Sequence, residues 1–279
     1  MSWSPAISAA GNRGRVLDGR RILRLGETLS AAGSALPRLW RGAWGAILLA
    51  AVVWGVQPLA AGMAGLVWAP FALAGTLALV GALARISIAD DLMQARGLGL
   101  GPAGLQFGRP EMRLLGAGLL CAVFMAMILS VVALVLLAVF GMAELNAQAI
   151  EMRRWGAVGP AWKLTLLAVV TAFALFAVVA FSARLSLFAP ATVGRGHMVS
   201  LNSMTIARGA FLSLLAGLIV TGAPEMGLVL LWGAGLLSGV AGWVVFVVVL
   251  TAIQAPLTMA FVGAAYRRLD GWTPPQDPA

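Results

Sequence analysis

Five long stretches of the chain carry no charged side chain, and no other feature constrains the fold as strongly. They cover Gly42 to Ala84, Leu114 to Ala143, Leu164 to Ala183, Gly209 to Pro224 and Met226 to Tyr266. About 20 apolar residues are needed to cross the hydrocarbon of a bilayer as a helix. Lipid offers no hydrogen-bond partners, so the backbone in such a segment must satisfy itself, as a helix does. The predicted fold class is therefore all-α: a polytopic integral membrane protein with about six transmembrane helices.

Composition argues against a soluble fold. Hydrophobic residues make up 61% of the 279 residues, and charged residues only 10%. A soluble domain of this composition would expose more apolar surface than water tolerates. The formal net charge of +9 would suggest nucleic-acid binding in a soluble chain. Here the positions of the charges give another explanation.

The basic residues are distributed unequally between the two sides of the predicted membrane. Sixteen of the nineteen lie on segments that alternating crossings place on one side, and only Arg153, Arg154 and Lys163 lie on the other. An excess of arginine and lysine marks the cytoplasmic side. Both termini are therefore predicted to be cytoplasmic. The near-total preference for arginine over lysine is typical of a GC-rich bacterial genome, so the expected location is the bacterial inner membrane.

These observations divide the chain into three parts. Residues 1–41 are predicted to be a cytoplasmic N-terminal segment. Residues 42–266 form the predicted six-helix membrane domain. The last part, 267–279, contains three prolines in its final seven residues and is predicted to be a disordered cytoplasmic tail.

The N-terminal segment has the pattern of an amphipathic helix. Apolar residues recur at spacings of three and four between Ile22 and Leu36, and arginines occupy the other faces. Such a helix lies flat on a membrane surface with its arginines toward anionic headgroups. The prediction is an interfacial helix from about Val16 to Ala35, ended by Pro37.

The first long stretch has twice the length of one crossing and contains Gln57 and Pro58 near its middle, so a helical hairpin is expected. The next two crossings flank a longer connection, residues 142–162, that should contain a short surface helix. The first four predicted spans are Gly42 to Gln57, Ala64 to Ala84, Leu114 to Phe140 and Lys163 to Ala183.

The C-terminal third allows two interpretations. Glu225 is the only charged residue between Arg208 and Arg267. The simpler interpretation has three parts: a fifth span from Ala210 to Gly222, a re-entrant or interfacial piece around Met226 to Leu237, and a sixth span from Val240 to Ala264. In the alternative, the fifth span continues past Pro224 with a kink.

Two motifs suggest chemistry that their context does not support. The segment Gly99-Leu-Gly-Pro-Ala-Gly104 matches the spacing of a dinucleotide-binding loop, but that loop requires a preceding strand in a βαβ unit. A flexible cytoplasmic loop is the expectation here. Asp90 and Asp91 are adjacent, and neighbouring helical residues diverge by about 100°, so a shared metal ion is not expected.

Polar residues within the apolar stretches are candidate functional sites, because burying them in lipid is costly. Glu225 and Gln254 are the main ones. Glu225 could bind a cation or a proton. Pro224 and Gly222 beside it indicate instead a turn at the periplasmic interface, which is the expectation.

Three short segments carry a family resemblance. They are Arg184-Leu-Ser-Leu-Phe-Ala-Pro190, Ser200-Leu-Asn-Ser-Met-Thr-Ile-Ala-Arg-Gly209 and Ala265-Tyr-Arg-Arg-Leu269. Together they resemble a group of bacterial six-helix inner-membrane proteins, which includes the YciC-like proteins and the membrane domain that accompanies some glycerophosphodiester phosphodiesterases. The resemblance implies six spans with cytoplasmic ends. The chain lacks the soluble catalytic domain of those phosphodiesterases, which argues against that activity.

The same segments suggest a contact site for lipid or a protein partner at the cytoplasmic face. The serines and threonine could cap helix N-termini, and the arginines could reach lipid phosphates. The candidate residues are Arg184, Ser200, Ser203, Thr205, Arg208, Arg267 and Arg268.

No catalytic constellation and no set of metal or cofactor ligands is recognisable. The leading hypothesis is a non-enzymatic membrane scaffold or regulatory partner that contacts membrane lipids, anionic ones among them, and an unknown protein, but not nucleic acid. The alternative is a small transporter or channel acting as an oligomer. The sequence leaves the oligomeric state open.

Overall fold

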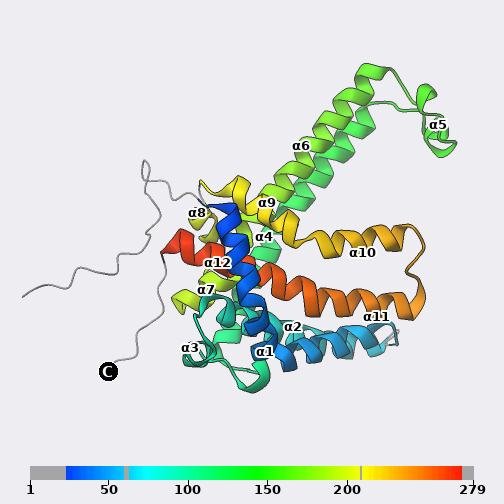
Figure 1. Ribbon diagram of the computed structural model, residues 1–279. Helices are drawn as coiled ribbons and strands as arrows, with labels where there is room; N and C mark the ends of the chain where they lie inside the picture. Colours follow the sequence, from blue (N-terminus) through cyan, green and yellow to red (C-terminus); the bar gives the residue numbers. More distant parts are fainter. Residues whose placement is uncertain (1–22, 60–62, 208, 272–279) are drawn as a thin grey trace, which may run out of the picture.

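The computed structural model describes residues 23–59, 63–207 and 209–271, and this part of the chain is helical without β-strands (Figure 1). The long helices are α1 (Leu25–Val56), α2 (Met63–Ile88), α4 (Arg109–Met142) and α6 (Ala161–Leu185). A further long run consists of α11 (Gly239–Val249), the π-helical segment η4 (Leu250–Gln254) and α12 (Ala255–Asp270). The shorter helices are α3 (Leu92–Gly97), α5 (Ala147–Glu151), α7 (Phe188–Arg195), α8 (Ser203–Ile206), α9 (Phe211–Thr221) and α10 (Ala223–Gly233). Three 3-10 turns are η1 (Gln57–Leu59), η2 (Pro102–Gly104) and η3 (Trp155–Ala157).

Three helical hairpins extend from a common base. They are α1–α2, α4–α6 and the pair formed by α10 with α11, and their connecting turns lie away from the base (Figure 1). The base contains the short helices α3, α7 and α8 and the C-terminal end of α12. Within these described ranges, five helices are long and apolar enough to cross a membrane, and a sixth crossing results if α9 and α10 are one bent span. The all-α polytopic prediction is confirmed.

The N-terminal helix differs from the prediction. α1 continues through Pro37 without interruption, so that proline does not end a separate interfacial helix, and the predicted boundary at residue 41 lies inside α1. Figure 1 shows α1 bending along its length, as expected where proline removes a backbone hydrogen bond. The apolar residues lie along one face of the helix, as predicted, but that face contacts protein. Ala32 is buried, and Leu25 and Leu29 pack against the protein core. The part of the predicted helix before Leu23 lies outside the described residues, as does the tail from residue 272.

Small residues let the central helices approach closely. α1, α2 and α12 contact one another, and the alanines at this contact include Ala43, Ala46, Ala82 and Ala260, all of them buried. Gly217 on α9 faces the ring of Phe261 on α12, and a Cβ there would lie 1.8 Å from the ring. In a membrane, where apolar side chains gain nothing by leaving lipid, such close packing is what holds helices together.

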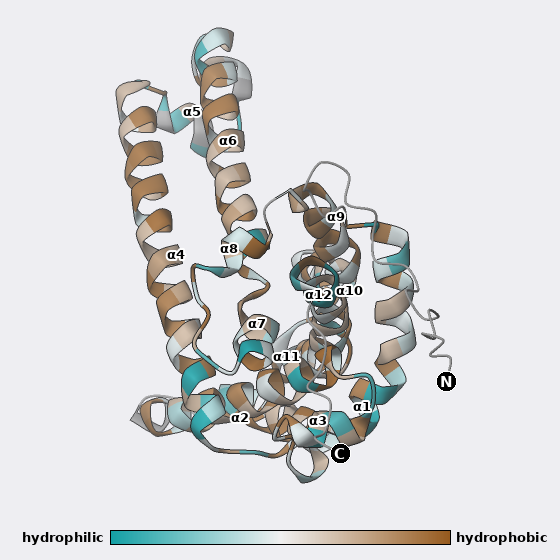
Figure 2. Cartoon of the chain, turned by 90° about the vertical axis from the view of Figure 1, so that its left-hand side faces the viewer, coloured by the Kyte–Doolittle hydropathy of each residue, from teal (hydrophilic) through white to brown (hydrophobic). Residues whose placement is uncertain are grey.

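Among the five long spans of the described residues, those of α4 and α6 are the least buried. None of the residues in the most apolar 18-residue window of the α4 span is buried, and 11% are buried in that of α6. Figure 2 shows apolar residues along both helices, with polar residues near the base and near α5. Phe124 and Phe181 join the two helices in a T-shaped contact, with ring centroids 6.0 Å apart. The predicted short helix between these two spans is present as α5.

The first and last described helices begin and end at the same end of the molecule. Glu27 near the start of α1 pairs with Arg268 near the end of α12, so the chain makes an even number of crossings between them. α9 has 11 residues, about 16 Å of helix, which is too short for the roughly 30 Å of hydrocarbon. α10 adds another 11 residues after a bend of 52°. Both interpretations give an even number of crossings, and the length of α9 favours the kinked alternative over a fifth span that ends at Gly222.

Candidate functional site

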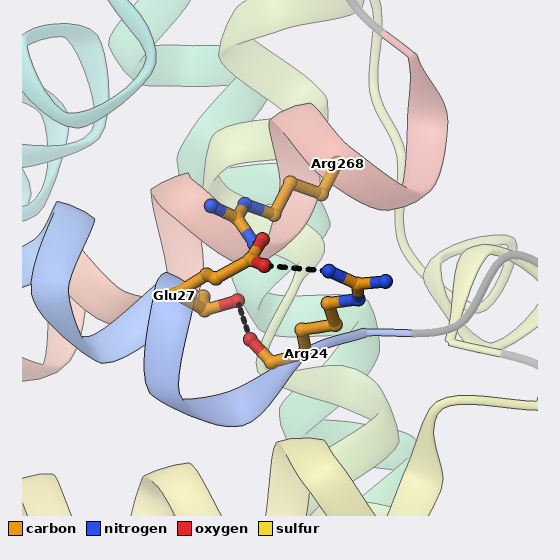
Figure 3. A network of polar contacts seen from close by, with 4 residues as sticks. Arg24, Glu27 and Arg268 are labelled. Atoms are coloured by element: carbon orange, nitrogen blue, oxygen red, sulfur yellow. Dashed lines mark hydrogen bonds and ion pairs between the residues drawn. The ribbon is translucent and has the colours of Figure 1, made fainter. Parts of the chain in front are cut away.

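Charged residues join the two ends of the described chain at the base. The Glu27 carboxylate accepts from Arg24 at 2.9 Å and from Arg268 at 3.0 Å (Figure 3). All three side chains are at least one third exposed. Solvent screens such pairs, so each adds little stability. Their main effect is to hold the ends of α1 and α12 together.

A second group of pairs lies where α2 meets α3. The Asp90 carboxylate accepts from Arg267 at 2.7 Å, and the Asp90 carbonyl accepts from Arg38. Farther along, Arg195 and Asp270 form an ion pair at 2.6 Å. The predicted contact residues Arg267 and Arg268 are therefore both engaged with carboxylates of this chain. A lipid contact at these two residues stays a prediction.

The remaining predicted contact residues lie on other elements. Arg184 is exposed at the end of α6, with its guanidinium 5.6 Å from the centroid of the Phe211 ring. Arg208 lies outside the described residues. The predicted helix caps are absent at α8, since the Ser203 hydroxyl donates to the Ser200 carbonyl and the Thr205 hydroxyl to the Asn202 carbonyl. These hydroxyls act as donors to their own local backbone, which satisfies them without capping any amide.

Sequence reasoning missed the most buried charged pair. Nη2 of Arg85, near the end of α2, lies 2.6 Å from Oε1 of Glu111 in the first turn of α4, and the side chains are 2% and 3% exposed. Arg85 Nε also donates to the Leu98 carbonyl at 3.0 Å. One signal was present in the sequence: Arg85 is the first charge after the longest early apolar stretch. Its partner could not be found by spacing, because 26 residues separate the two.

The glycine-rich segment before α4 packs against this pair and against α1. The Gly101 amide donates to Oε1 of Gln106 at 3.1 Å. Gly104 has a φ of +80°, and a Cβ there would lie 2.9 Å from the Ala43 Cα. Only glycine fits both that conformation and that approach without strain. The match to a dinucleotide fingerprint thus has a packing explanation, since the segment packs on α1, and the flexibility expected of this loop stays a prediction.

Within the described residues, two buried donors beside the pair have no acceptor. They are Nη1 of Arg85 and Nε2 of Gln106. Both lie close to Gly81, since a Cβ there would be 3.0 Å and 3.4 Å from these atoms. Buried donors of this kind are usually satisfied by an ordered water.

No family model, no curated protein and no solved structure matches this chain. The resemblance to bacterial six-helix inner-membrane proteins therefore stays a prediction, and the residues themselves carry the functional argument. Within the described part of the chain, no three His, Cys, Asp or Glu side chains group as metal ligands. The carboxylates of Asp90 and Asp91 have different partners. Asp90 pairs with Arg267, and Asp91 caps α3 by accepting from the Gln94 amide at 2.7 Å.

The second polar region lies farther from the base, where two helices are irregular. Glu225 is exposed in the first turn of α10, just after the bend. Glu225 thus lies directly after the 52° bend between α9 and α10, and its predicted position at the periplasmic interface stays a prediction. α10 packs against η4, whose Gln254 is buried. Gln254 donates through Nε2 to Thr258 at 3.1 Å, while its Oε1 has no donor within the described residues.

The π-helical segment explains one long-range hydrogen bond. A π-turn shifts the backbone register, which frees carbonyl groups for outside partners, and such turns are frequent at functional sites. Nε1 of Trp40 on α1 donates to the Ala252 carbonyl within η4 at 2.8 Å. The irregular segment is thereby fixed to α1. The structure brings the breaks in two helices together, a relationship that residue spacing alone did not predict.

Proposed function

We propose that this protein is a non-enzymatic scaffold or regulatory partner of the bacterial inner membrane, with both termini cytoplasmic. In this proposal the base faces the cytoplasm and contacts lipid headgroups. The α4–α6 hairpin binds a partner protein within the bilayer.

The exposure of the α4–α6 hairpin carries the proposal. α4 has 34 residues, about 51 Å of helix, which exceeds the hydrocarbon thickness of about 30 Å. Side chains along the hairpin such as Leu134, Leu137 and Phe173 are 65%, 71% and 73% exposed. The base, in contrast, is held by paired charges. A base joined by paired charges, together with an apolar hairpin whose two helices are little buried, suits a protein that positions another membrane protein.

In-membrane crosslinking from the hairpin tests the proposal. A photoreactive residue at Leu134 or Phe173 should give a discrete protein adduct that is the same from both positions. Leu48 and Val52 on α1 are the matched controls, because they are 54% and 52% exposed but lie on another hairpin. Those positions should give lipid adducts only. The same adduct pattern from both hairpins would refute a partner site on α4–α6, and an adduct with twice the mass of the chain would identify the partner as a second copy.

One observation favours a small transporter or channel as the second candidate. The bent pair packs against η4 through α10, and broken helices commonly form the substrate sites of transporters. Thiol labelling separates the two functions. With Cys121 replaced by serine, a cysteine at Gln254 should be inaccessible to a small water-soluble thiol reagent if the protein is a scaffold. Rapid labelling of that cysteine would show a water pathway and favour transport.

A further inference from the structure

A shallow depression of about 400 Å³ opens at the base between α1 and the start of α3. Ser34, Pro37, Arg38 and Arg41 line it from one face of α1, and Asp91 and Leu92 line it from the other side. The lining therefore contains two guanidinium groups, one hydroxyl and one carboxylate. None of the residues predicted from the sequence as lipid contacts belongs to it.

The two arginines differ in how far their hydrogen-bonding capacity is used. Arg38 donates to the Asp90 carbonyl, while its buried Nε has no acceptor within the described residues. Arg41 is exposed, three residues farther along the same face. Guanidinium donors bind phosphate oxygens strongly, in single or paired hydrogen bonds. The Ser34 hydroxyl on the same side already donates to the Ala31 carbonyl at 2.9 Å, so the guanidinium groups supply the donors. This half of the depression has the chemistry of a phosphate site.

The other half carries the opposite charge. Asp91 accepts the Gln94 amide through Oδ1 as the cap of α3. The lining as a whole keeps a positive charge that attracts a phosphate, and the carboxylate could accept the hydrogen bonds of a primary ammonium. A ligand that carries a phosphate and an ammonium a few bonds apart satisfies both halves.

The position of the depression favours a lipid as the source of this ligand. Trp40 and Trp44 follow on the same helix and are 42% and 58% exposed. Exposed tryptophans mark the interface between hydrocarbon and headgroups. The charge-free stretch begins at Gly42, directly after Arg41 and about one helical turn after Arg38. The depression thus lies at the depth of lipid phosphates.

We infer that this depression binds the headgroup of a phospholipid with a phosphodiester and a primary ammonium, as in phosphatidylethanolamine. The two arginines bind the phosphate, and Asp91 binds the ammonium. The inference goes beyond the proposed partner role, because it concerns α1 and α3 and not the α4–α6 hairpin. Either can fail without the other, since the crosslinking readout and the lipid readout are independent.

Native mass spectrometry of the full chain tests the inference. The protein is released from nanodiscs with equal amounts of phosphatidylethanolamine and phosphatidylglycerol, and the retained lipids are counted. Wild-type protein should retain phosphatidylethanolamine preferentially. Asp91→Asn keeps the helix cap, since asparagine caps as well as aspartate, but removes the charge. It should lower the ethanolamine-to-glycerol retention ratio by roughly two- to fivefold, as expected for one exposed ion pair.

Arg41→Gln should reduce the retention of both lipids by a similar factor. Arg96→Gln is the control, because Arg96 is an exposed arginine on α3 outside the depression, and it should change neither. An unchanged ratio in Asp91→Asn, or unchanged retention in Arg41→Gln, would overturn the inference.

A second measurement distinguishes lipid from a soluble phosphate compound. Phosphoethanolamine is added to delipidated protein in detergent, and thermal unfolding is followed. Little stabilisation is expected, because the soluble headgroup lacks the acyl chains that anchor it beside the tryptophans. If phosphoethanolamine raises the unfolding temperature of the wild type but not of Arg41→Gln, and no lipid is retained in nanodiscs, the site binds a soluble ligand and the lipid assignment is wrong.

Discussion

Nη2 of Arg85 lies 2.6 Å from Oε1 of Glu111, and both side chains are at least 97% buried. This pair joins the end of α2 to the beginning of α4, and through the Leu98 carbonyl it also holds the connecting segment. The α4–α6 hairpin starts directly from it. The direction in which that hairpin extends thus depends on an ion pair shielded from solvent.

Glu111→Gln should strongly destabilise the protein. The substitution leaves the buried Arg85 guanidinium without its counter-charge, at a cost of about 3–5 kcal/mol when one partner of a buried pair is lost. Thermal unfolding in detergent should show a clear decrease in midpoint. Glu27→Gln removes a carboxylate from the exposed Arg24–Glu27–Arg268 group and should have a far smaller effect. Equal effects of the two substitutions would contradict the structural role assigned to Arg85 and Glu111.

Gly104→Ala should disrupt the packing of the glycine-rich segment on α1. The added Cβ would lie 2.9 Å from the Ala43 Cα and 3.2 Å from the Gly42 carbonyl oxygen, and backbone cannot move aside easily. A cost of about 1–3 kcal/mol is typical of such overpacking. Gly97→Ala is the matched control, because a Cβ there meets nothing within 4 Å. Protease cleavage between α3 and α4 should increase in Gly104→Ala and stay low in Gly97→Ala.

Gly217→Ala should separate α9 from α12. The new methyl group would lie 1.8 Å from the Phe261 ring, and that ring is completely buried. Gly227→Ala is the control. Gly227 lies on α10 in the same bent pair, and there is open space around its Cβ position. Unfolding midpoints should fall for the first variant and stay near wild type for the second. A stable Gly217→Ala protein would show that α9 does not pack on α12 as described.

Trp40→Phe should loosen the π-helical segment. The substitution keeps the aromatic ring but removes the donor to the Ala252 carbonyl, at a cost of about 0.5–1.5 kcal/mol for a single hydrogen bond. Trp44→Phe changes a tryptophan one turn away that is 58% exposed and should cost less. Hydrogen exchange resolved to the segment between α11 and α12 would detect the loosening. Identical exchange in the two variants would argue against this role of Trp40.

Single cysteines test the sidedness of the chain. With Cys121 replaced by serine, Arg24→Cys and Arg268→Cys should react with a membrane-impermeant thiol reagent only in inside-out vesicles. Arg153→Cys, between α5 and η3, should react only in right-side-out vesicles. Labelling of residues 24 and 268 from opposite sides would contradict the even number of crossings. Labelling of both from outside would invert the proposed orientation.

The long apolar spans were predictable because their cause is local. A charge-free stretch in lipid must satisfy its own backbone, so the positions of α2, α4 and α6 follow from the residues within each helix. The α1–α2 hairpin and the short helix α5 were predicted on the same basis. The end of the N-terminal helix was not, because Pro37 was taken as a stop. A proline can be accommodated inside a helix as a bend when the flanking turns pack against other helices, as those of α1 do.

The polar sites depended on contacts that no local pattern encodes. Arg267 and Arg268 were predicted to reach lipid, yet they pair with Asp90 and Glu27, which lie 177 and 241 residues away. The spacing of Gly101 and Gly104 suggested a nucleotide loop or a free one, whereas Gly104 provides a close approach to α1. Small-residue spacing occurs throughout a chain so rich in alanine and glycine, so only the structure could select Gly217 as a helix contact.

By itself, the sequence determined that this chain belongs in a bilayer, that it is helical, and approximately where it crosses. The reason is that insertion of an apolar segment into lipid depends on the composition of that segment alone. The tertiary structure decided which charges neutralise one another, that α9 and α10 join at a bend beside η4, and that Arg38, Arg41 and Asp91 share one depression. Those relationships depend on contacts between side chains of helices that are far apart in the sequence. The residues along one helix do not determine such contacts, because they arise only when the helices pack together.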